Sequence, residues 1–357
     1  MKKRIVIAAG GTGGHVYPAM ATAEALVAEG NHEILFIGAG LHHNKFFQRD
    51  RYAYEDISSG FGLKTFFPLI KGVYQSIRLL RKYTPDVIVS FGSYHSLPPL
   101  LAGKALRIPL ALHEANSIPG KVVKLMGRFS HVTGVQFPSA KHHLTGEVIE
   151  MPLPLRPGYR KGEVSRNSAA AYYGIDPNLP TLLIFGGSQG SQAINKAITA
   201  PFLYAVKSVI GSFQILHFSG GDNEFIKLKE LYAGCGIRAV VKNHEPHMNY
   251  AWGCSDLAIA RSGASTIAEQ LAFEIPAIYI PYPEAAENHQ YLNALFVVNQ
   301  VRVGDLLHQR DLDSATLAQK ILAILSKEEH KQNLVHNIQS YNQRKCRQTL
   351  SEWILKL

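Results

Sequence analysis

The fold is decided by Arg4-Ile-Val-Ile-Ala-Ala-Gly-Gly-Thr-Gly-Gly14, a stretch in which a short apolar segment runs into a glycine-rich turn. The same form returns in Thr181-Leu-Leu-Ile-Phe-Gly-Gly-Ser-Gln-Gly190. An apolar strand, a glycine turn and a following helix are the start of a parallel α/β unit. The repeat predicts two doubly wound, Rossmann-like parallel-sheet domains that face each other across a cleft. Ligands are expected beyond the carboxyl ends of the strands, where both turns lie.

The alternation of strands and helices continues along both halves. In the first half we expect strands at 4–9, 33–38, 86–91 and 109–113, with helices at 18–29, 66–83, 97–106 and 120–129. In the second half, strands are expected at 181–185, 214–219, 239–241, 256–260 and 277–280. Between the halves, Met151-Pro-Leu-Pro-Leu-Arg-Pro-Gly158 has three prolines in six residues, which exclude a helix or a central strand. The sequence therefore predicts domains over residues 1–157 and 158–340, joined by a stiff linker.

Composition narrows the class of protein. The chain has 357 residues, 46% hydrophobic and 18% charged, enough for two domains of about 150 residues and inconsistent with disorder. No apolar run approaches the ~18 residues of a membrane-spanning helix. Only five apolar residues follow the basic N-terminus before Gly10, too few for a signal peptide. The three cysteines, Cys235, Cys254 and Cys346, lack metal-type spacing and are typical of a reducing cytoplasm.

Positive charge is concentrated in the first half. Residues 1–157 hold 18 basic and 10 acidic side chains, a balance of +8 out of the total of +10. Such a half could face nucleic acid, an anionic membrane or a phosphorylated substrate. Nucleic acid is the weakest of the three, because the chain has no recognition motif and no long basic block.

The glycine turns favour a phosphate-type ligand, because they point free N–H groups and a helix dipole at an anion. Neither turn is G-x-G-x-x-G, and G-x-x-x-x-G-K-[ST] is absent, so dinucleotide dehydrogenases and P-loop NTPases are not indicated. One such turn could simply be a tight turn; two in equivalent places favour a ligand. A third cluster, 261–269, ends in Glu269, which could accept hydrogen bonds from ribose hydroxyls. Taken alone, that cluster is better explained as a packed helix start.

Five motifs in order carry a family resemblance. They are Gly10-Gly-Thr-Gly-Gly-His15, His113-Glu-Ala-Asn-Ser-Ile-Pro-Gly120, Gly186-Gly-Ser-Gln-Gly190, Arg261-Ser-Gly-Ala-Ser-Thr266 with Glu269, and His289-Gln-Tyr-x-Asn-Ala294. The set resembles the bacterial cell-wall glycosyltransferases that add N-acetylglucosamine to undecaprenyl-diphosphate-linked muramyl-pentapeptide, converting lipid I into lipid II. The resemblance implies a GT-B fold with an acceptor-binding N-domain, a UDP-sugar-binding C-domain, and a last helix, about 341–357, that returns to the N-domain.

The resemblance also implies ligands, place and site residues. It implies UDP-N-acetylglucosamine as donor, lipid I as acceptor, no cofactor, and a peripheral position on the cytoplasmic side of the inner membrane, in contact with anionic lipids and with cell-wall synthesis or division proteins. Glu269 is expected on the ribose, the main chain of Glu245 at the uracil edge, and Gln290 in the sugar-binding segment. The other donor-binding residues implied are Thr12, Gly13, Gly14, Asn116, Arg156, Ser188, Gln189, Ala264, Ser265 and Thr266.

Four positions depart from the family pattern. Ser93 stands where the second N-domain loop usually has a glycine, and Leu153-Pro154 stands where Asn-Pro usually precedes the linker arginine. His289-Gln290 replaces a glutamine pair, and Glu245 replaces an aliphatic residue. Ser93 narrows the backbone approach for an anion, whereas a main-chain contact at residue 245 can survive the change of side chain.

The chemistry that the family performs is an inverting displacement giving a β-1,4 linkage. It needs a base on the acceptor hydroxyl and stabilisation of the departing UDP, for which the turn Gly187–Gly190 and Arg156 are suited. Our hypothesis is that His15 is the base, because a helix start disfavours imidazolium; a capping role is the alternative. Glu114 is the rival base, or else it holds the loop through Asn116.

No metal is expected. Asp311-Leu312-Asp313 resembles the D-x-D of metal-dependent transferases but is favoured as a helix cap. The histidines show no metal-binding motif, and the adjacent pairs His42-His43 and His142-His143 point apart on a helix or a strand.

Residues 66–82 carry apolar positions at helical spacing, 66, 70, 73, 77 and 80, with basic residues along the rim. A core-packing helix and a membrane-surface helix both fit; the lipid acceptor favours the second. The predicted membrane patch comprises Phe66, Phe67, Ile70, Lys71, Ile77, Arg78 and Arg81, extended by Lys121, Lys124 and Arg128. Two other functions are alternatives: another GT-B UDP-sugar enzyme, and a non-catalytic membrane-surface scaffold.

Overall fold

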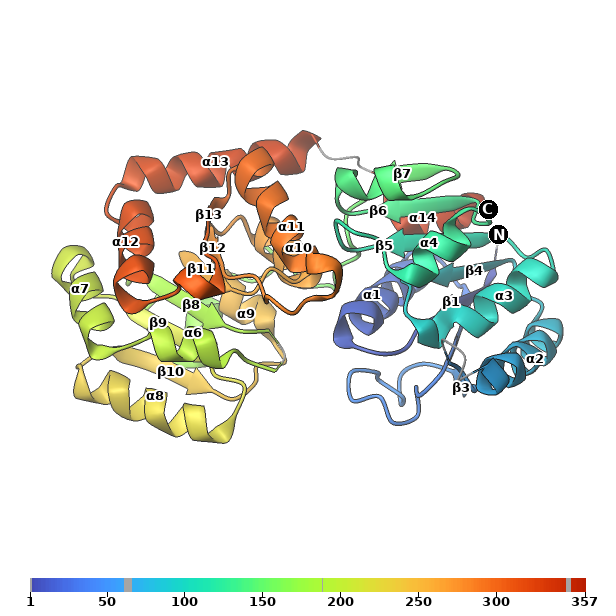
Figure 1. Cartoon of the computed structure of the whole chain (residues 1–357), viewed down its shortest axis with the longest axis horizontal. Coiled ribbons are helices and arrows are strands. Elements are labelled where there is room, and N and C mark those ends of the chain that lie inside the picture. Colours follow the sequence, from blue (N-terminus) through green and yellow to red (C-terminus); the bar gives the residue numbers. More distant parts are fainter. Residues whose placement is uncertain (1, 61–65, 188, 345–347) are drawn as a thin grey trace. The chain divides into compact units, whose positions relative to one another are not determined.

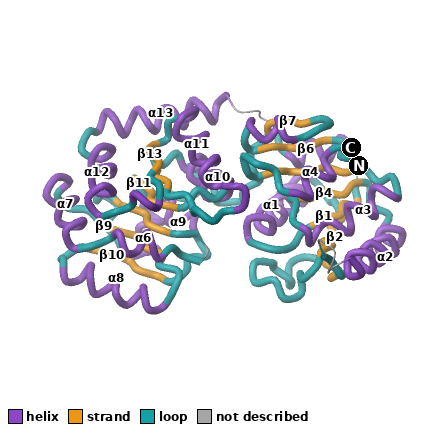
Figure 2. Tube along the Cα trace, viewed as in Figure 1, coloured by secondary structure: helices purple, strands orange, loops and turns teal. Residues whose placement is uncertain are grey.

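The chain folds into two compact units, each built on one parallel sheet. The computed structural model describes residues 2–60, 66–187, 189–344 and 348–357. One unit comprises Met1–Pro157 with Lys345–Leu357, and the other comprises Gly158–Arg344. Figure 2 shows the strands of each unit flanked by helices.

The first unit has a seven-stranded sheet of order β3-β2-β1-β4-β5-β6-β7, in which every neighbouring pair is parallel. Its strands are β1 (Arg4–Ala8), β2 (Glu33–Gly38), β3 (Tyr54–Asp56), β4 (Val87–Ser90), β5 (Leu110–Glu114), β6 (Val132–Val135) and β7 (Val148–Glu150). Its helices are α1 (Gly13–Glu29), α2 (Phe66–Tyr83), α3 (Leu97–Ala105), α4 (Lys121–Gly127) and α14 (Leu350–Lys356), with short 3-10 turns η2 (Tyr94–Ser96) and η3 (Pro138–His143).

Alternation along β1 distributes the first unit's core between two faces. Ile5 and Ile7 join a cluster with residues of α1 and α14, whereas Val6 and Ala8 join a cluster with residues of α2, α3 and α4. Successive side chains of a strand point to opposite faces, so a strand that is apolar throughout is buried on both. Figure 1 shows helices on both faces of this sheet.

The second unit has a six-stranded parallel sheet of order β10-β9-β8-β11-β12-β13. Its strands are β8 (Thr181–Phe185), β9 (Gln214–Phe218), β10 (Arg238–Lys242), β11 (Leu257–Ala260), β12 (Ala277–Tyr279) and β13 (Gly304–Leu306). Its helices are α5 (Arg166–Tyr173), α6 (Gln192–Ala197), α7 (Ala200–Ile210), α8 (Asp222–Gly234), α9 (Met248–Gly253), α10 (Ala264–Phe273), α11 (His289–Phe296), α12 (Ser314–Leu325) and α13 (Glu328–Arg344), with short turns η4 (Ala286–Asn288), η5 (Val297–Val301) and η6 (Gln309–Asp311).

Both sheets are doubly wound, which confirms the predicted fold class. The strand order reverses beside β1, which lies between β2 and β4, and beside β8, which lies between β9 and β11. Both glycine turns therefore follow the strands at the switch points, where ligands of such sheets bind. The sequence did not single out β3, β6, β7 and β13, because these short strands contain Gly, Thr, Asp or Glu and so do not read as apolar runs.

Two helix boundaries differ from the predictions by more than two residues. Helix α1 begins at Gly13, so Pro18 lies inside it and not at its start. Because proline has no N–H, the helical hydrogen bond to the Gly14 carbonyl cannot form there. Near the C-terminus, α13 runs on to Arg344, and the segment that packs on the first unit is the separate helix α14, which contributes Leu350 and Ile354 to the core around α1.

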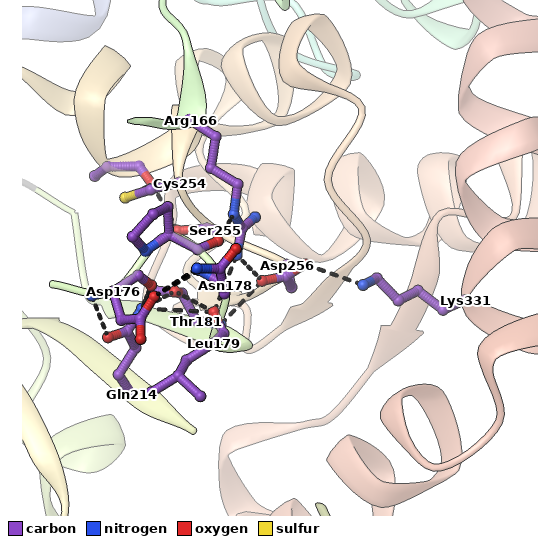
Figure 3. Close-up of polar contacts among 12 residues, drawn as sticks. Arg166, Asp176, Asn178, Leu179, Thr181, Gln214, Cys254, Ser255, Asp256 and Lys331 are labelled. Atoms are coloured by element: carbon purple, nitrogen blue, oxygen red, sulfur yellow. Dashed lines mark hydrogen bonds and ion pairs between the residues drawn. The ribbon is translucent and has the colours of Figure 1, made fainter. Parts of the chain in front are cut away.

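A shielded carboxylate ties together the amino-terminal edge of the second sheet. Asp256 accepts hydrogen bonds from Arg166 Nη2 (2.8 Å), the backbone N–H of Thr181 (2.9 Å) and Lys331 Nζ (3.0 Å), as Figure 3 shows. These partners lie on α5, β8 and α13. Burial alone would raise the pKa of Asp256, but the two cations outweigh burial and hold that pKa below its ordinary value.

We expect Asp256→Asn to lower the free energy of unfolding by about 2–3 kcal/mol at pH 7, less than a fully buried pair because both cations are partly exposed. Since the folded pKa is depressed, the carboxylate stabilises the fold fully above about pH 4 and loses that effect as the pH falls through the folded pKa. Urea unfolding of wild type and variant should therefore converge in acid. The exposed Asp50→Asn serves as control; an Asp256→Asn protein of wild-type stability at pH 7 would contradict the expectation.

Candidate active site

His15 lies in the first turn of α1 with one ring nitrogen fixed. Its Nδ1 is 2.8 Å from the carbonyl oxygen of Phe91, which follows β4. A carbonyl only accepts, so Nδ1 carries the proton and Nε2 is left as the basic atom. Burial lowers the pKa of His15, the Phe91 carbonyl partly opposes this, and the neighbouring His95 lowers it further. The imidazole is therefore neutral at pH 7.

The first glycine turn divides into a packed half and an open half. A Cβ on Gly10 would lie 2.6 Å from His95 Cβ, and one on Gly11 would lie 3.0 Å from Ser93 Oγ, so these two glycines are required by packing against η2. A Cβ on Gly14 would meet only the Thr12 hydroxyl within 4 Å among the described residues. The exposed Thr12 and Gly14 are thus the part of the turn that is open to a ligand.

Glu114 uses both carboxylate oxygens to shape the loop after β5. Oε1 accepts from the backbone N–H of Asn116 (2.9 Å) and from its Nδ2 (3.3 Å), and Oε2 accepts from the backbone N–H of Gly120 (2.8 Å). Burial raises the pKa of Glu114, and these bonds only partly offset that change. The carboxylate therefore fixes the position of Asn116. This geometry is the one expected if Glu114 holds the loop and is not the base.

Arg156, in the linker, belongs to the first unit and lies beside α1. Its guanidinium carbon is 4.6 Å from the centroid of the Tyr17 ring, a cation–π contact. Tyr17 also packs edge-on against Phe46, with ring centroids 5.7 Å apart. The contact therefore holds this cation against the same helix start that carries His15.

The second glycine turn is packed backbone against backbone. A Cβ on Gly190 would overlap the carbonyl oxygen of Ser219, and one on Gly186 would overlap the carbonyl carbon of Gly190. Gly187 has φ +85°, and a Cβ added there would meet no described atom within 4 Å, so its side of the turn is open. Gln189 is exposed, whereas Ser188 lies outside the described residues.

A chain of buried hydrogen bonds, in which each donor and acceptor is fixed, ends at the Ser219 carbonyl beside the second glycine turn. His217 Nε2 donates to Asn195 Oδ1 (3.0 Å), so its Nδ1 must accept from the Tyr232 hydroxyl (2.7 Å). Asn195 Nδ2 then donates to the carbonyl of Ser219 (3.0 Å). Burial lowers the pKa of His217 to about 3, so the chain keeps its direction at neutral pH.

The cluster after β11 contains an oriented carboxylate. Trp252 Nε1 donates to Glu269 Oε2 at 2.9 Å and so orients that carboxylate, which lies within α10. Ala264, Ser265 and Thr266 form the first turn of the same helix. No sequence signal pointed to Trp252, because this tryptophan lies outside every one of the motifs.

Arg261 is a buried cation that belongs to a predicted motif but had no predicted role. It donates to the carbonyls of Ile280 and Pro281, to Ser191 Oγ (2.8 Å) and to Gln309 Oε1 (2.6 Å). Ser191 is the N-cap of α6, directly after the glycine turn. Arg261 therefore places a positive charge beside the end of the second glycine turn and anchors Ser191, the residue that follows this turn.

Gln290 and Glu245 are both held by specific contacts. Gln290 Oε1 accepts from the backbone N–H of Tyr282 (3.0 Å), and its carbonyl accepts from Ser262 Oγ (2.7 Å). Glu245 pairs with Lys242 Nζ at 2.7 Å. Burial alone would raise the pKa of Glu245, but Lys242 and a backbone N–H outweigh burial and lower it.

In the D-x-D sequence Asp311-Leu312-Asp313, the second aspartate caps a helix. Asp313 Oδ1 accepts from the backbone N–H of Thr316 at 2.8 Å and is the N-cap of α12, as predicted. Within the described ranges, no group of three or more His, Cys, Asp or Glu residues is placed to hold a metal ion.

Helix α2 exposes a different apolar set from the one predicted. Phe66, Phe67, Ile70 and Tyr74 are 54%, 82%, 50% and 62% exposed. Ile77 is half-buried and packs against the core, so the prediction that it belongs to the exposed patch is wrong. Tyr74 is exposed beside the predicted residues, although the helical spacing did not indicate it. Lys71, Arg78 and Arg81 are exposed. Among the described helices, none combines the length and the apolar character that crossing a membrane requires.

Comparison with known proteins first defines the class. Residues 5–134 match the glycosyltransferase family 28 N-terminal domain, and residues 181–350 match the family 28 C-terminal domain. The structure resembles the crystal structure of Acinetobacter baumannii MurG, with a TM-score of 0.78 and 23% identity over 99% of this chain and 100% of that one. It also resembles a UDP-glucose:anthocyanidin 3-O-glucosyltransferase, with a TM-score of 0.67 and 14% identity over 100% and 94%. The fold is GT-B, as the sequence predicted.

Relatives then define the family. The chain is 41% identical to the UDP-N-acetylglucosamine–N-acetylmuramyl-(pentapeptide) pyrophosphoryl-undecaprenol N-acetylglucosamine transferase of Protochlamydia amoebophila, over 99% of this chain and 96% of the relative. It is 36% identical to the enzyme of the same name from Chlamydia trachomatis, over 91% of both. The chain belongs to this family of N-acetylglucosamine transferases.

Proposed function

We propose that this chain transfers N-acetylglucosamine from UDP-N-acetylglucosamine to the C4 hydroxyl of N-acetylmuramyl-pentapeptide-diphosphoryl-undecaprenol, with inversion, to give lipid II. The observation that carries the proposal is the 41% identity, across 99% of the chain, to a transferase named for this donor and acceptor. A non-catalytic scaffold would need neither a histidine with one nitrogen committed to a carbonyl nor a carboxylate oriented by Trp252.

In the proposed step, His15 Nε2 takes the proton of the acceptor hydroxyl as that oxygen attacks the anomeric carbon of the donor sugar. The bond from this carbon to the diphosphate oxygen breaks, and its electron pair leaves with UDP. The Phe91 carbonyl holds the imidazolium that results. Glu114 acts as a loop-holding residue in this scheme, because both of its oxygens are already used on the loop.

The donor is assigned to the second unit, with contributions from the first. The leaving diphosphate is assigned to the N–H groups of the turn that contains Gly187, Ser188 and Gln189, together with the Arg156 cation. Glu269 meets the ribose, the main chain at Glu245 meets the uracil edge, and Gln290 meets the sugar. The remaining donor contacts proposed are Thr12, Gly13, Gly14, Asn116, Ala264, Ser265 and Thr266.

We also propose that α2 rests on an anionic membrane at its cytoplasmic face. The exposed Phe66, Phe67, Ile70 and Tyr74 supply apolar area, and Lys71, Arg78 and Arg81 supply charge. This surface, the α2 patch, would keep the enzyme at the leaflet that holds its lipid-linked acceptor. Cell-wall synthesis or division proteins are the class of protein partner proposed.

The decisive test follows UDP release from UDP-N-acetylglucosamine with and without a lipid I analogue. We expect UDP to appear only with the analogue, together with a disaccharide product detected by mass spectrometry. No turnover with a competent analogue would overturn the transferase proposal and favour the scaffold.

His15→Ala should lower kcat by about 10²–10⁴-fold, the usual contribution of a general base, and leave the KM for the donor within about twofold. Because the neutral imidazole is the active form and its pKa lies below 6.5, the wild-type rate should fall only at acid pH. That acid limb should vanish in the variant. His43→Ala, an exposed histidine, is the control; near-normal kcat in His15→Ala would exclude His15 as the base.

Binding to phosphatidylglycerol vesicles should exceed binding to phosphatidylcholine vesicles and should weaken in about 1 M salt, where the screening length is about 3 Å. Arg78→Glu/Arg81→Glu should reduce partitioning at least about tenfold, since each surface cation adds about 1 kcal/mol. Phe67→Ser should also weaken it, whereas Tyr204→Ser, an aromatic 53% exposed on α7, should not. Equal binding to both vesicle types would argue against the α2 patch.

A further inference from the structure

The loop between β10 and α9 contains a carboxylate that has no access to solvent. Glu245 is 3% exposed as a residue, and its side chain is fully buried. Oε2 lies 2.7 Å from Lys242 Nζ, and Oε1 accepts from the backbone N–H of His247 (2.8 Å) and from the Tyr172 hydroxyl (3.4 Å). Both oxygens are therefore committed inside the protein, and the side chain has no face to offer a ligand.

The cation of this pair is partly exposed and lies against two aromatic rings. Lys242 Nζ lies 4.7 Å from the centroid of the Tyr172 ring and 4.8 Å from that of Tyr173. Tyr172 in turn stacks on Tyr250, with centroids 4.6 Å apart and planes 11° apart. The Lys242–Glu245 pair thus joins four segments: α5, β10, the loop and α9.

The same loop is tied to the second glycine turn. The backbone N–H of Ser219 donates to the Lys242 carbonyl (2.9 Å), and that of Gly220 donates to the Asn243 carbonyl (3.0 Å). Gly220 packs directly on Gly190, where an added Cβ would overlap the Gly190 Cα. The end of the loop next to β10 is therefore anchored on the residues that pack against the turn.

The carboxylate also sets the start of α9. By accepting from His247 N–H it holds the residue before the first turn of that helix. Trp252, on the same helix, donates to Glu269. One buried carboxylate thereby holds the loop at residue 245 and the helix that orients Glu269.

We propose that the Lys242–Glu245 ion pair positions the main chain of residues 243–246 to read the base, and so makes the site selective for uracil. The inference rests on the proposed function, which places this main chain at the base edge. Uracil presents an acceptor where cytosine presents an amino donor, so backbone groups held in one position can distinguish the two bases. Glu245 is a positioning residue in this scheme and does not touch the nucleotide.

The test measures binding by calorimetry, without the acceptor, using UDP, CDP and inorganic diphosphate. Glu245→Gln and Lys242→Met should each raise the Kd for UDP about tenfold and reduce the preference for UDP over CDP by a similar factor. The Kd for inorganic diphosphate should stay within about twofold.

Glu274→Gln is the matched control, since Glu274 is another shielded carboxylate of this unit, paired with Lys161 and Gln339. It should lower stability without changing any of the three Kd values. Lys242→Arg keeps the charge and should keep the selectivity, which covers the case in which Glu245→Gln folds poorly.

Unchanged UDP affinity and selectivity in both single variants would overturn the inference. If wild type binds UDP selectively but fails to transfer sugar to a lipid I analogue, the transferase proposal falls and the positioning role stands.

Discussion

The second unit of this molecule depends on two backbones that touch. Gly190 and Gly220 lie so close that a Cβ on either would strike the other's turn, and each turn follows a strand of the same parallel sheet. That contact brings the ends of β8 and β9 together. Asn195 holds one side through the Ser219 carbonyl, and Arg261 holds the other through Ser191. These contacts fix Gly190 at the end of the turn, and fixed backbone N–H groups are what binding a diphosphate requires.

In the first unit, the state of the candidate base His15 depends on a single backbone carbonyl. Phe91 O accepts a hydrogen bond from the Nδ1–H of His15 and thereby decides which nitrogen is basic. Burial and a second histidine keep the ring neutral. The glycines beside it have another purpose, since Gly10 and Gly11 make room for His95 and Ser93. A glycine-rich motif can thus combine packing and ligand access within five residues.

Charge has three distinct uses in this chain. The Asp256 cluster closes the amino-terminal edge of the second sheet, away from the glycine turn, and contributes stability. The Lys242–Glu245 pair holds the position of one loop. The exposed Lys71, Arg78 and Arg81 rim an apolar surface on α2. The last of these lies in the half of the chain that carries the positive excess, whereas the other two lie in a unit with little net charge.

The amino-acid sequence by itself determined the fold class, the two glycine turns and the family, because buried parallel strands are apolar throughout and the motifs are local in the chain. It also placed His15 at the start of one helix and Asp313 as the cap of another, because each signal is local to a single helix start. The tertiary structure alone decided the basic nitrogen of His15, the orientation of Glu269 by Trp252, the burial of Ile77 and the pairing of Glu245. Each of these depends on where a side chain points in the fold, or on a contact with a residue that no motif links to it, so no local pattern records it.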